Sequence, residues 1–109
     1  AYMNQTQNGN KPLIISEIGA GAIYGYRNEN KCKWSEERQA EILEKQITAV
    51  LDDKDVCGVF VWQFCDCRVD ESWFYGRPGC NNNKGIVDEF RRKKLAFNVV
   101  KDIFNKYKE

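Results

Sequence analysis

The chain has 109 residues, of which 42% are hydrophobic and 30% are charged, and this composition is typical of a soluble globular sequence. Its 17 basic and 16 acidic residues give a net charge of +1, which offers no electrostatic reason to expect a nucleic-acid partner. The longest apolar runs fall far short of the roughly 20 residues that span a bilayer, so we expect no membrane partner. The absence of histidine removes Ser-His and Cys-His nucleophile pairs and the commonest metal ligand.

The sequence contains an odd number of cysteines, which does not suggest a paired disulfide framework: Cys32, Cys57, Cys65, Cys67 and Cys80. We therefore expect a reducing compartment, the cytoplasm. The one-residue gap in Cys65-Asp66-Cys67 raises a zinc hypothesis, but it differs from the usual spacing of zinc ligands, and we expect no metal and no cofactor. No signal peptide is visible.

The first predicted elements are a flexible leading segment over residues 1–11, which is polar, and a strand over residues 12–15. The strand is an unbroken apolar run, as expected of a parallel strand that is covered on both faces. Glu17 follows at its C-terminal end. Ser35 is then a plausible N-cap, and the spacing of the next apolar residues predicts an amphipathic helix that covers a sheet, with a stripe of Ala40, Leu43, Ile47, Val50 and Leu51.

A second strand is predicted over residues 56–62, which form another unbroken apolar run and end at Trp62. Residues 63–85 form a connection long enough to indicate a function. The basic run at residues 91–94 is interpreted as a solvated entrance to a second helix. That helix has one apolar face, formed by Ala96, Val99, Val100, Ile103 and Tyr107.

This alternation of strand and helix predicts an α/β fold with a parallel sheet. The two predicted strands are apolar on both faces, and they need neighbouring strands that the chain does not supply. A TIM (β/α)8 barrel needs roughly 250 residues, so two strand-helix units would form about a quarter of one. We therefore expect a fragment, which should self-associate to cover its open surfaces.

Four residues are candidates for a site, and each has a plainer interpretation. Glu17 lies where barrel enzymes carry catalytic groups, but it could be a solvated loop acid. Trp62 could be a stacking floor for a sugar ring or simply a core aromatic. Asn82 and Lys84 could bind a carboxylate or phosphate, or could be turn residues.

Four blocks of sequence, in register from about Lys11 to the C-terminus, resemble a known family. They are Pro-Leu-Ile-Ile-Ser-Glu-Ile-Gly-Ala, Trp-Ser-Glu-Glu-Arg-Gln-Ala-Glu, Gly-Val-Phe-Val-Trp-Gln-Phe-Cys-Asp, and Asn-Asn-Lys-Gly-Ile-Val-Asp-Glu-Phe-Arg-Arg-Lys-Lys-Leu-Ala. They closely resemble the end of the catalytic barrel in glycoside hydrolase family 2, and within it the β-glucuronidases. The resemblance implies that residues 12–109 are the C-terminal portion of that TIM-barrel domain, with its last two strand-helix units.

The resemblance also implies roles for the four candidates. Glu17 would be the nucleophile, Trp62 the active-site tryptophan, and Asn82 and Lys84 the pair that holds the C6 carboxylate of the sugar. The sequence departs from the usual pattern at Ile18, Gly21, Gln63, Cys65 and Cys67.

The expected function is therefore part of a retaining β-glycosidase, a β-glucuronidase that hydrolyses terminal β-linked uronides. Its acid/base lies on an earlier strand in the family, so the fragment alone should be inactive; Asn28-Glu29 is a poor candidate for that role. Two alternatives remain at this point. One is a β-galactosidase-type hydrolase of the same family. The other is a non-catalytic carbohydrate-binding module that uses Trp62, Trp73, Tyr75, Asn82 and Lys84.

Overall fold

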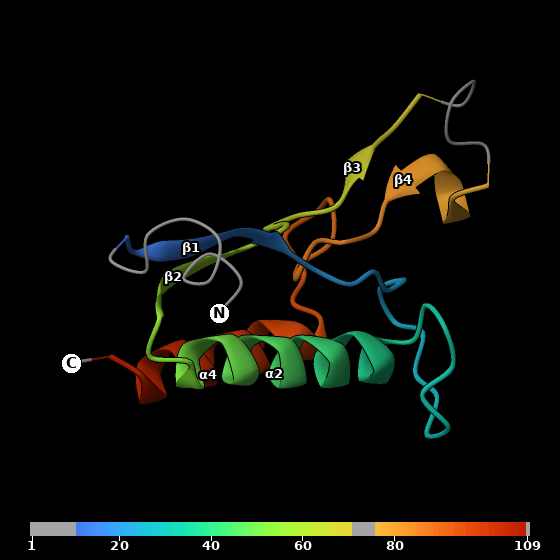
Figure 1. Ribbon diagram of the computed structural model, residues 1–109. Helices are drawn as coiled ribbons and strands as arrows, with labels where there is room; N and C mark the ends of the chain where they lie inside the picture. The colour runs from blue at the N-terminus through green and yellow to red at the C-terminus, as the bar shows by residue number, and fades with distance from the viewer. Residues whose placement is uncertain (1–10, 71–75, 109) are drawn as a thin grey trace.

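The computed structural model describes residues 11–70 and 76–108 of the chain (Figure 1). Its main elements are β1 (Leu13–Ile18), α2 (Glu36–Asp52), β2 (Val56–Val61) and α4 (Leu95–Lys106). Their order confirms the predicted alternation of strand and helix. Residues 1–10, nearly all of the predicted leading segment, lie outside the described residues.

The two long strands form a parallel sheet in which α2 is part of the connection. Ile15 pairs with Val59 and Ile18 pairs with Val61, with a register shift between these two pairs. Glu17 lies within that irregular step. The strand was expected to finish before Glu17, but β1 continues to Ile18, so the carboxylate belongs to the end of the strand itself.

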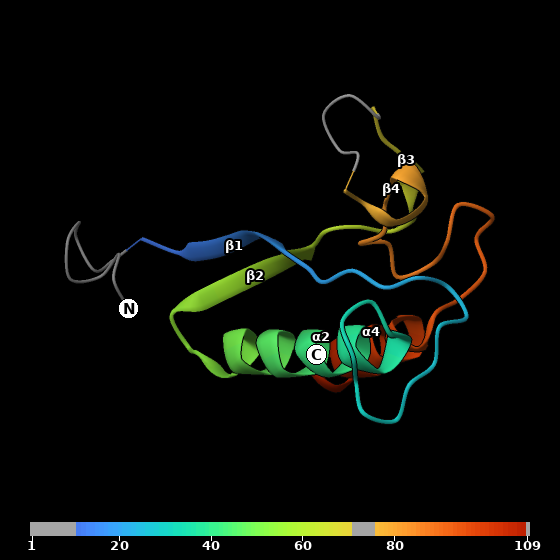
Figure 2. The ribbon, with the colours of Figure 1, turned by 90° about the vertical axis from the view of Figure 1, so that its right-hand side faces the viewer.

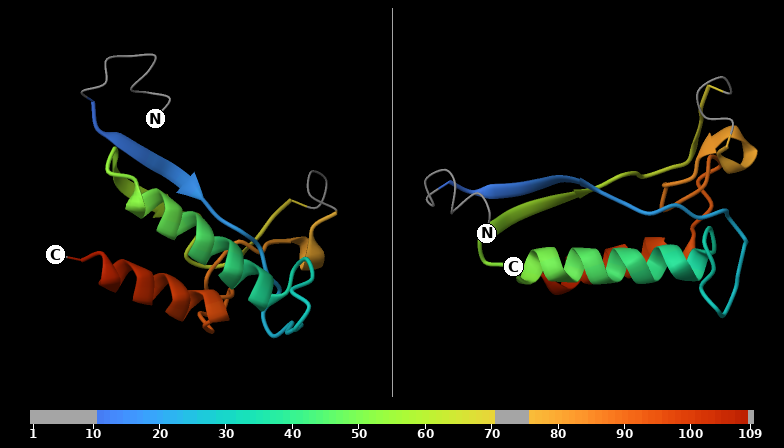
Figure 3. Two further views of the ribbon diagram at one scale, coloured as in Figure 1. Left: turned by 60° about the horizontal axis from the view of Figure 1, so that its bottom comes forward. Right: turned by 45° about the vertical axis from the view of Figure 1, so that its right-hand side comes forward.

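The two helices lie side by side against one face of the sheet, and both begin near the end at which the strands finish (Figures 1 and 3). Partly buried strand residues Ile18, Val59 and Val61 pack onto this helical layer. Burying these apolar side chains supplies the main favourable free energy of the unit. The predicted stripes are confirmed in their central members, because the buried cluster consists of Leu43, Ile47, Ala96, Val100 and Ile103. The other predicted stripe residues are partly buried.

Local signals explain where α2 begins. Ser35 has an extended backbone, and its Oγ accepts a hydrogen bond from the backbone N–H of Arg38 at 3.1 Å. Glu36 and Glu37 follow in the first turn, where negative charge favours the positive end of the helix dipole. The predicted N-cap is therefore confirmed.

The other face of the sheet has no covering layer among the described residues (Figure 2). Ile14 and Phe60 expose 53% and 63% of their surface there, and Trp62 at the end of β2 exposes 45%. Each long strand also has a hydrogen-bonded partner on one side only within the described part of the chain. The unit therefore presents apolar surface of the kind that normally lies against other protein.

The long connection after β2 is partly ordered into short elements. β3 (Cys67–Arg68) and β4 (Asn81–Asn82) pair antiparallel, with a 3-10 turn, η1 (Pro78–Cys80), directly before β4. This hairpin projects beyond the carboxyl ends of the long strands (Figure 1). The sequence did not predict these elements, and the aromatic residues at 73–75 lie outside the described residues.

Within the described ranges, no helix is both long and apolar enough to cross a membrane.

Candidate active site

Glu17 and Trp62 lie at the carboxyl ends of the two neighbouring strands. The backbone N–H of Trp62 donates to the carbonyl oxygen of Ile18 at 2.6 Å, which fixes the end of β2 beside the end of β1. Gly19 continues this close approach, because a Cβ at that position would lie 2.0 Å from the carbonyl oxygen of Trp62. The carboxylate of Glu17 and the indole of Trp62 are both exposed.

The segment that carries Asn82 and Lys84 is bonded to the same strand end. The backbone N–H of Gln63 donates to the carbonyl oxygen of Lys84 at 3.0 Å, and the carbonyl oxygen of Gln63 accepts from the N–H of Ile86 at 3.0 Å. Gln63 directly follows Trp62, so all four predicted site residues come to one end of the sheet. This is also where catalytic groups gather in parallel α/β folds.

Asn82 adopts a turn geometry that orients its side chain. Its Oδ1 accepts a hydrogen bond from the backbone N–H of Lys84 at 3.1 Å. The turn interpretation of these residues is therefore correct, and it is compatible with ligand binding. With Oδ1 engaged, the amide hydrogens on Nδ2 are the groups that Asn82 can offer to an incoming carboxylate.

A buried lysine lies beneath these loops, and for this residue the sequence interpretation was wrong. Residues 91–94 were expected to be a solvated entrance to the second helix; residues 91–93 are exposed, but the Lys94 side chain is 0% exposed. Its Nζ donates to the carbonyl oxygen of Ala22 at 2.7 Å, to Asp66 Oδ1 at 2.9 Å, and to the carbonyl oxygen of Asn83 at 3.1 Å. Three loops therefore meet at one ammonium group.

Burial controls the titration of the pair formed by Asp66 and Lys94. It raises the pKa of Asp66 above its ordinary value, although the Lys94 ammonium and the hydrogen bond from the N–H of Gly85 act in the opposite direction. It lowers the pKa of Lys94 against the hydrogen bond and charge of Asp66. Each charge is therefore costly to bury and depends on the other.

The first turns of α2 supply two more buried polar side chains. Gln39 Nε2 donates to the carbonyl oxygens of Ala20 and Gly85, both at 2.9 Å. Glu36 accepts from the backbone N–H of Gly25 at 2.5 Å and from that of Leu95 at 2.7 Å. The buried face of α2 is thus polar where it meets the loops and apolar below them.

Gly21, one of the departures from the family pattern, has no room for a side chain. A Cβ there would lie 2.7 Å from Cζ3 of Trp34 and 3.5 Å from the carbonyl oxygen of Asn83. The ring of Trp34 therefore occupies the space beside the Asn83 backbone.

The structure also bears on two weaker candidates. All five cysteines are free thiols, and the described residues contain no group of three or more His, Cys, Asp or Glu side chains that could hold a metal ion, so the zinc hypothesis has no geometric support. Asn28 and Glu29 belong to a turn in the loop before α2, where the N–H of Asn28 donates to Glu37 at 2.9 Å.

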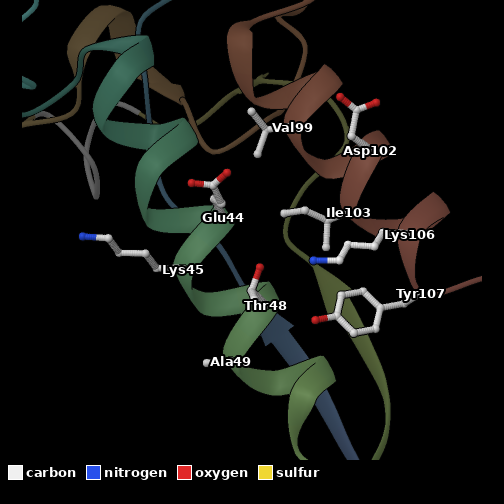
Figure 4. Close-up of a pocket in the computed structure, with 9 residues that line it drawn as sticks. All are labelled: Glu44, Lys45, Thr48, Ala49, Val99, Asp102, Ile103, Lys106 and Tyr107. Atoms are coloured by element: carbon white, nitrogen blue, oxygen red, sulfur yellow. The ribbon is translucent and has the colours of Figure 1, made fainter.

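A groove of about 670 Å³ between α2 and α4 is separate from the candidate site (Figure 4). Glu44, Thr48, Ile103 and Tyr107 line it, and they lie further along the helices than the N-terminal turns that meet the loops. It contains neither Glu17 nor Lys84. The groove and the four candidate residues at the strand ends therefore belong to different parts of the surface.

Several proteins are similar to this chain, although no family model matches it. The β-glucuronidase of Canis lupus familiaris is 36% identical over 98 residues, which are 87% of this chain and 14% of that protein. The β-glucuronidase of Sus scrofa is 36% identical over 89 residues, or 79% of this chain and 13% of that protein. The chain thus spans about one seventh of the length of these relatives.

Solved structures show the same likeness. A GH2 β-galacturonidase from Eisenbergiella tayi, bound to galacturonate, matches with a TM-score of 0.89 and 53% identity over 96% of this chain and 19% of its own. A β-D-glucuronidase from Dictyoglomus thermophilum matches with a TM-score of 0.79 and 29% identity over 88% and 16%. These sequence and structural matches agree with the four blocks of sequence and the arrangement of the strands. The chain belongs to glycoside hydrolase family 2, as a β-glucuronidase-like segment.

Proposed function

We propose that this chain is the nucleophile-bearing and carboxylate-binding part of a retaining β-uronidase. The observation that carries the proposal is the pair of backbone hydrogen bonds, Trp62 to Ile18 and Gln63 to Lys84. They bring a strand-end carboxylate, an exposed indole, an amide and an ammonium to one end of the sheet. The curated relatives are β-glucuronidases, which supports a uronide as substrate.

In this proposal Glu17 attacks the anomeric carbon of the bound sugar. A bond forms between a Glu17 carboxylate oxygen and C1 while the bond from C1 to the leaving oxygen breaks, and that oxygen takes a proton from a second carboxylic acid. Water then attacks C1, the second group removes its proton, and Glu17 leaves. Two displacements at C1 retain the β configuration.

The second carboxyl group must lie about 5–5.5 Å from the nucleophile in a retaining enzyme. We propose that an earlier strand supplies it and that the chain forms the last two strand-helix units of a (β/α)8 barrel. The uncovered apolar face and the open edges of the long strands support this view, because a closed barrel would cover both. The chain alone should then be inactive. The longer protein of this proposal, with the earlier strands, is the full-length enzyme.

The remaining three side chains would bind the sugar. Lys84 Nζ and Asn82 Nδ2 would donate charge-assisted hydrogen bonds to the C6 carboxylate, replacing the solvation that it loses in the pocket. Trp62, which is 45% exposed, would offer its ring to the apolar face of the sugar. No metal or other cofactor enters these proposed roles.

Two epimers are candidate substrates. The curated relatives favour a β-glucuronide, whereas the E. tayi β-galacturonidase shares 53% identity and favours a β-galacturonide. Gly21 has no room for a side chain beside Asn83, the residue between the two proposed carboxylate donors. This packing next to the donors is a structural reason to compare the two uronides as substrates. Both carry the C6 carboxylate, so either fits the role proposed for Lys84.

The test is the hydrolysis of four 4-nitrophenyl β-glycosides by the full-length enzyme: glucuronide, galacturonide, glucoside and galactoside. We expect kcat/KM to be much higher for one or both uronides than for the neutral sugars. A preference for the galactoside would contradict the uronide proposal and leave the β-galactosidase-type alternative. A full-length protein that binds uronides without hydrolysing them would leave only the binding-module alternative.

A further inference from the structure

We infer that Lys94 is a positioning residue that sets where the Asn82–Lys84 pair stands relative to the strand that carries Glu17. The inference rests on the proposed function, because it concerns how the substrate carboxylate is held. Lys94 does not touch substrate in this arrangement, since its side chain is completely buried. Its effect would pass through the backbone of the residue between Asn82 and Lys84.

That residue, Asn83, is held from two directions. Its carbonyl oxygen accepts from Lys94 Nζ at 3.1 Å and from the backbone N–H of Ala22 at 2.9 Å. The carbonyl group lies in the short backbone segment from which the Asn82 and Lys84 side chains project. A displacement of Asn83 would therefore move both proposed carboxylate donors together.

The same ammonium also binds the loop that follows the nucleophile strand. Lys94 Nζ donates to the carbonyl oxygen of Ala22 at 2.7 Å, and Ala22 lies in the loop after β1, the strand that contains Glu17. The third hydrogen bond is to Asp66 in the loop after β2. All three donor hydrogens of the ammonium have acceptors, one in each loop.

Both ends of Lys94 are anchored. Its backbone N–H donates to the carbonyl oxygen of Ile86 at 3.1 Å, and the residue stands at the N-cap of α4, the helix that packs in the core. The side chain thus connects the N-terminal end of a core helix to three loops by hydrogen bonds. This is a supporting shell of the kind that keeps binding groups within a fraction of an ångström of their working geometry.

The expected consequence is selective. Two donors must meet the two oxygens of a substrate carboxylate at hydrogen-bond distance, so a small displacement of residues 82–84 weakens charge-assisted bonds strongly. A neutral sugar has no such charge for these donors to hold. Loss of Lys94 should therefore raise KM for uronides more than it changes kcat, and should reduce the preference for uronides over neutral sugars.

The experiment compares Lys94→Met with wild type in the full-length enzyme. Because Lys94→Met leaves Asp66 buried without its cation, Lys94→Met/Asp66→Asn is made in parallel; asparagine keeps an acceptor for the N–H of Gly85. Kinetics are measured with the 4-nitrophenyl uronides and the matching neutral glycosides. Active sites are counted with a mechanism-based 2-deoxy-2-fluoroglycoside, so that unfolded enzyme does not enter the constants.

We expect at least one Lys94 variant to show a rise of about tenfold or more in KM for the uronides. Its kcat/KM for the neutral sugars, calculated per active site, should stay within about twofold of wild type. Leu43→Ala is the matched control, because it opens the helical core. It should lower the amount of active enzyme without changing the uronide preference.

Equal losses on charged and neutral substrates, or failure of both Lys94 variants to yield folded enzyme, would overturn the inference by showing a purely structural role. A wild-type enzyme with no uronide preference would instead overturn the proposed function. The two failures are therefore distinguishable.

Discussion

The α-carbon of Gly85 lies so close to Asp66 that a Cβ added to the glycine would stand 2.3 Å from the backbone nitrogen of Asp66. The same Cβ would lie 2.4 Å from the carbonyl carbon of Cys65 and 2.4 Å from the carbonyl oxygen of Val87. These contacts are all with backbone atoms, which cannot rotate away. Only glycine allows the residue that follows the Asn82–Lys84 segment to lie against Cys65 and Asp66, in the connection after β2.

Gly85→Ala should therefore destabilise the segment by about 2 kcal/mol or more, since overpacking and backbone displacement act together. The thermal midpoint of the full-length enzyme and hydrogen exchange at Gly85 and Ile86 would report it. Gly76→Ala is the control, because a Cβ at that exposed position meets nothing within 4 Å. Equal effects of the two substitutions would show that the close packing at Gly85 is unimportant.

The buried pair gives a second prediction, which includes its pH dependence. Lys94→Met should lower the local stability of residues 82–86 by about 3–5 kcal/mol at neutral pH, because Asp66 keeps a buried charge without a partner. The pKa of Asp66, already raised by burial, should rise further when its cation is removed. Protonation of a group whose pKa is higher in the folded state than in the unfolded state favours the folded state. The loss of stability should therefore shrink as the pH falls through this raised pKa towards the ordinary value of an aspartate.

Lys94→Met/Asp66→Asn should recover a large part of the lost stability, and its remaining deficit should show little of this pH dependence. Hydrogen exchange of the peptide that contains residues 82–86, corrected for intrinsic rates at each pH, would measure both effects. If the single variant lost the same stability at every pH, Asp66 would not be the source of the penalty.

The isolated 109-residue chain should self-associate. Its sheet exposes Ile14 and Phe60 on one face, and each long strand has an open edge among the described residues. Sedimentation at high micromolar concentration should reveal a dimer or larger species, and Phe60→Lys should reduce it. A compact monomer for the unmodified chain would contradict the prediction.

Glu17→Gln should abolish turnover in the full-length enzyme while leaving uronide binding largely intact, because the amide keeps the shape of the side chain and loses the nucleophile. A 2-deoxy-2-fluoroglycoside should label Glu17 in the wild type, and peptide mass spectrometry would locate the adduct. Labelling at any other carboxylate would overturn the assignment. Glu29→Gln, in the turn before α2, should keep full activity as the matched control.

The periodic parts of the fold could be predicted from local sequence. Ser35 is a side-chain N-cap, and the apolar stripe from Leu43 to Ile47 is buried as its spacing requires. These features depend on neighbours within a few turns of helix. Glu17 and Trp62 could likewise be placed at strand ends, because Trp62 closes one unbroken apolar run and Glu17 follows the other after a single serine.

The buried polar network could not be predicted in the same way. Lys94 looks like one of four consecutive basic residues, and its environment is set by acceptors 11, 28 and 72 positions away along the chain. Gln39 offered a weak signal, since it lies one turn before Leu43 on the same side of α2. The short β3–β4 hairpin lacks a periodic pattern because each of its strands has only two residues.

The last prediction concerns the carboxylate itself. Lys84 projects from a segment that is bonded to Gln63, Asp66 and Gln39, so its removal should leave the backbone in place. Lys84→Ala should cost on the order of 2–5 kcal/mol of uronide binding in a closed site, because it leaves the substrate carboxylate desolvated without its cation.

This cost corresponds to a loss of about 30-fold or more in kcat/KM for the preferred uronide in the full-length enzyme. Hydrolysis of the matching neutral glycoside should hardly change, since that substrate carries no charge for Lys84 to hold. Lys101→Ala, an exposed lysine on α4, serves as the matched control and should change neither rate. Because the segment is held by backbone bonds that Lys84→Ala does not remove, equal losses on charged and neutral substrates would mean that the Lys84 side chain supports the loop instead of recognising the carboxylate.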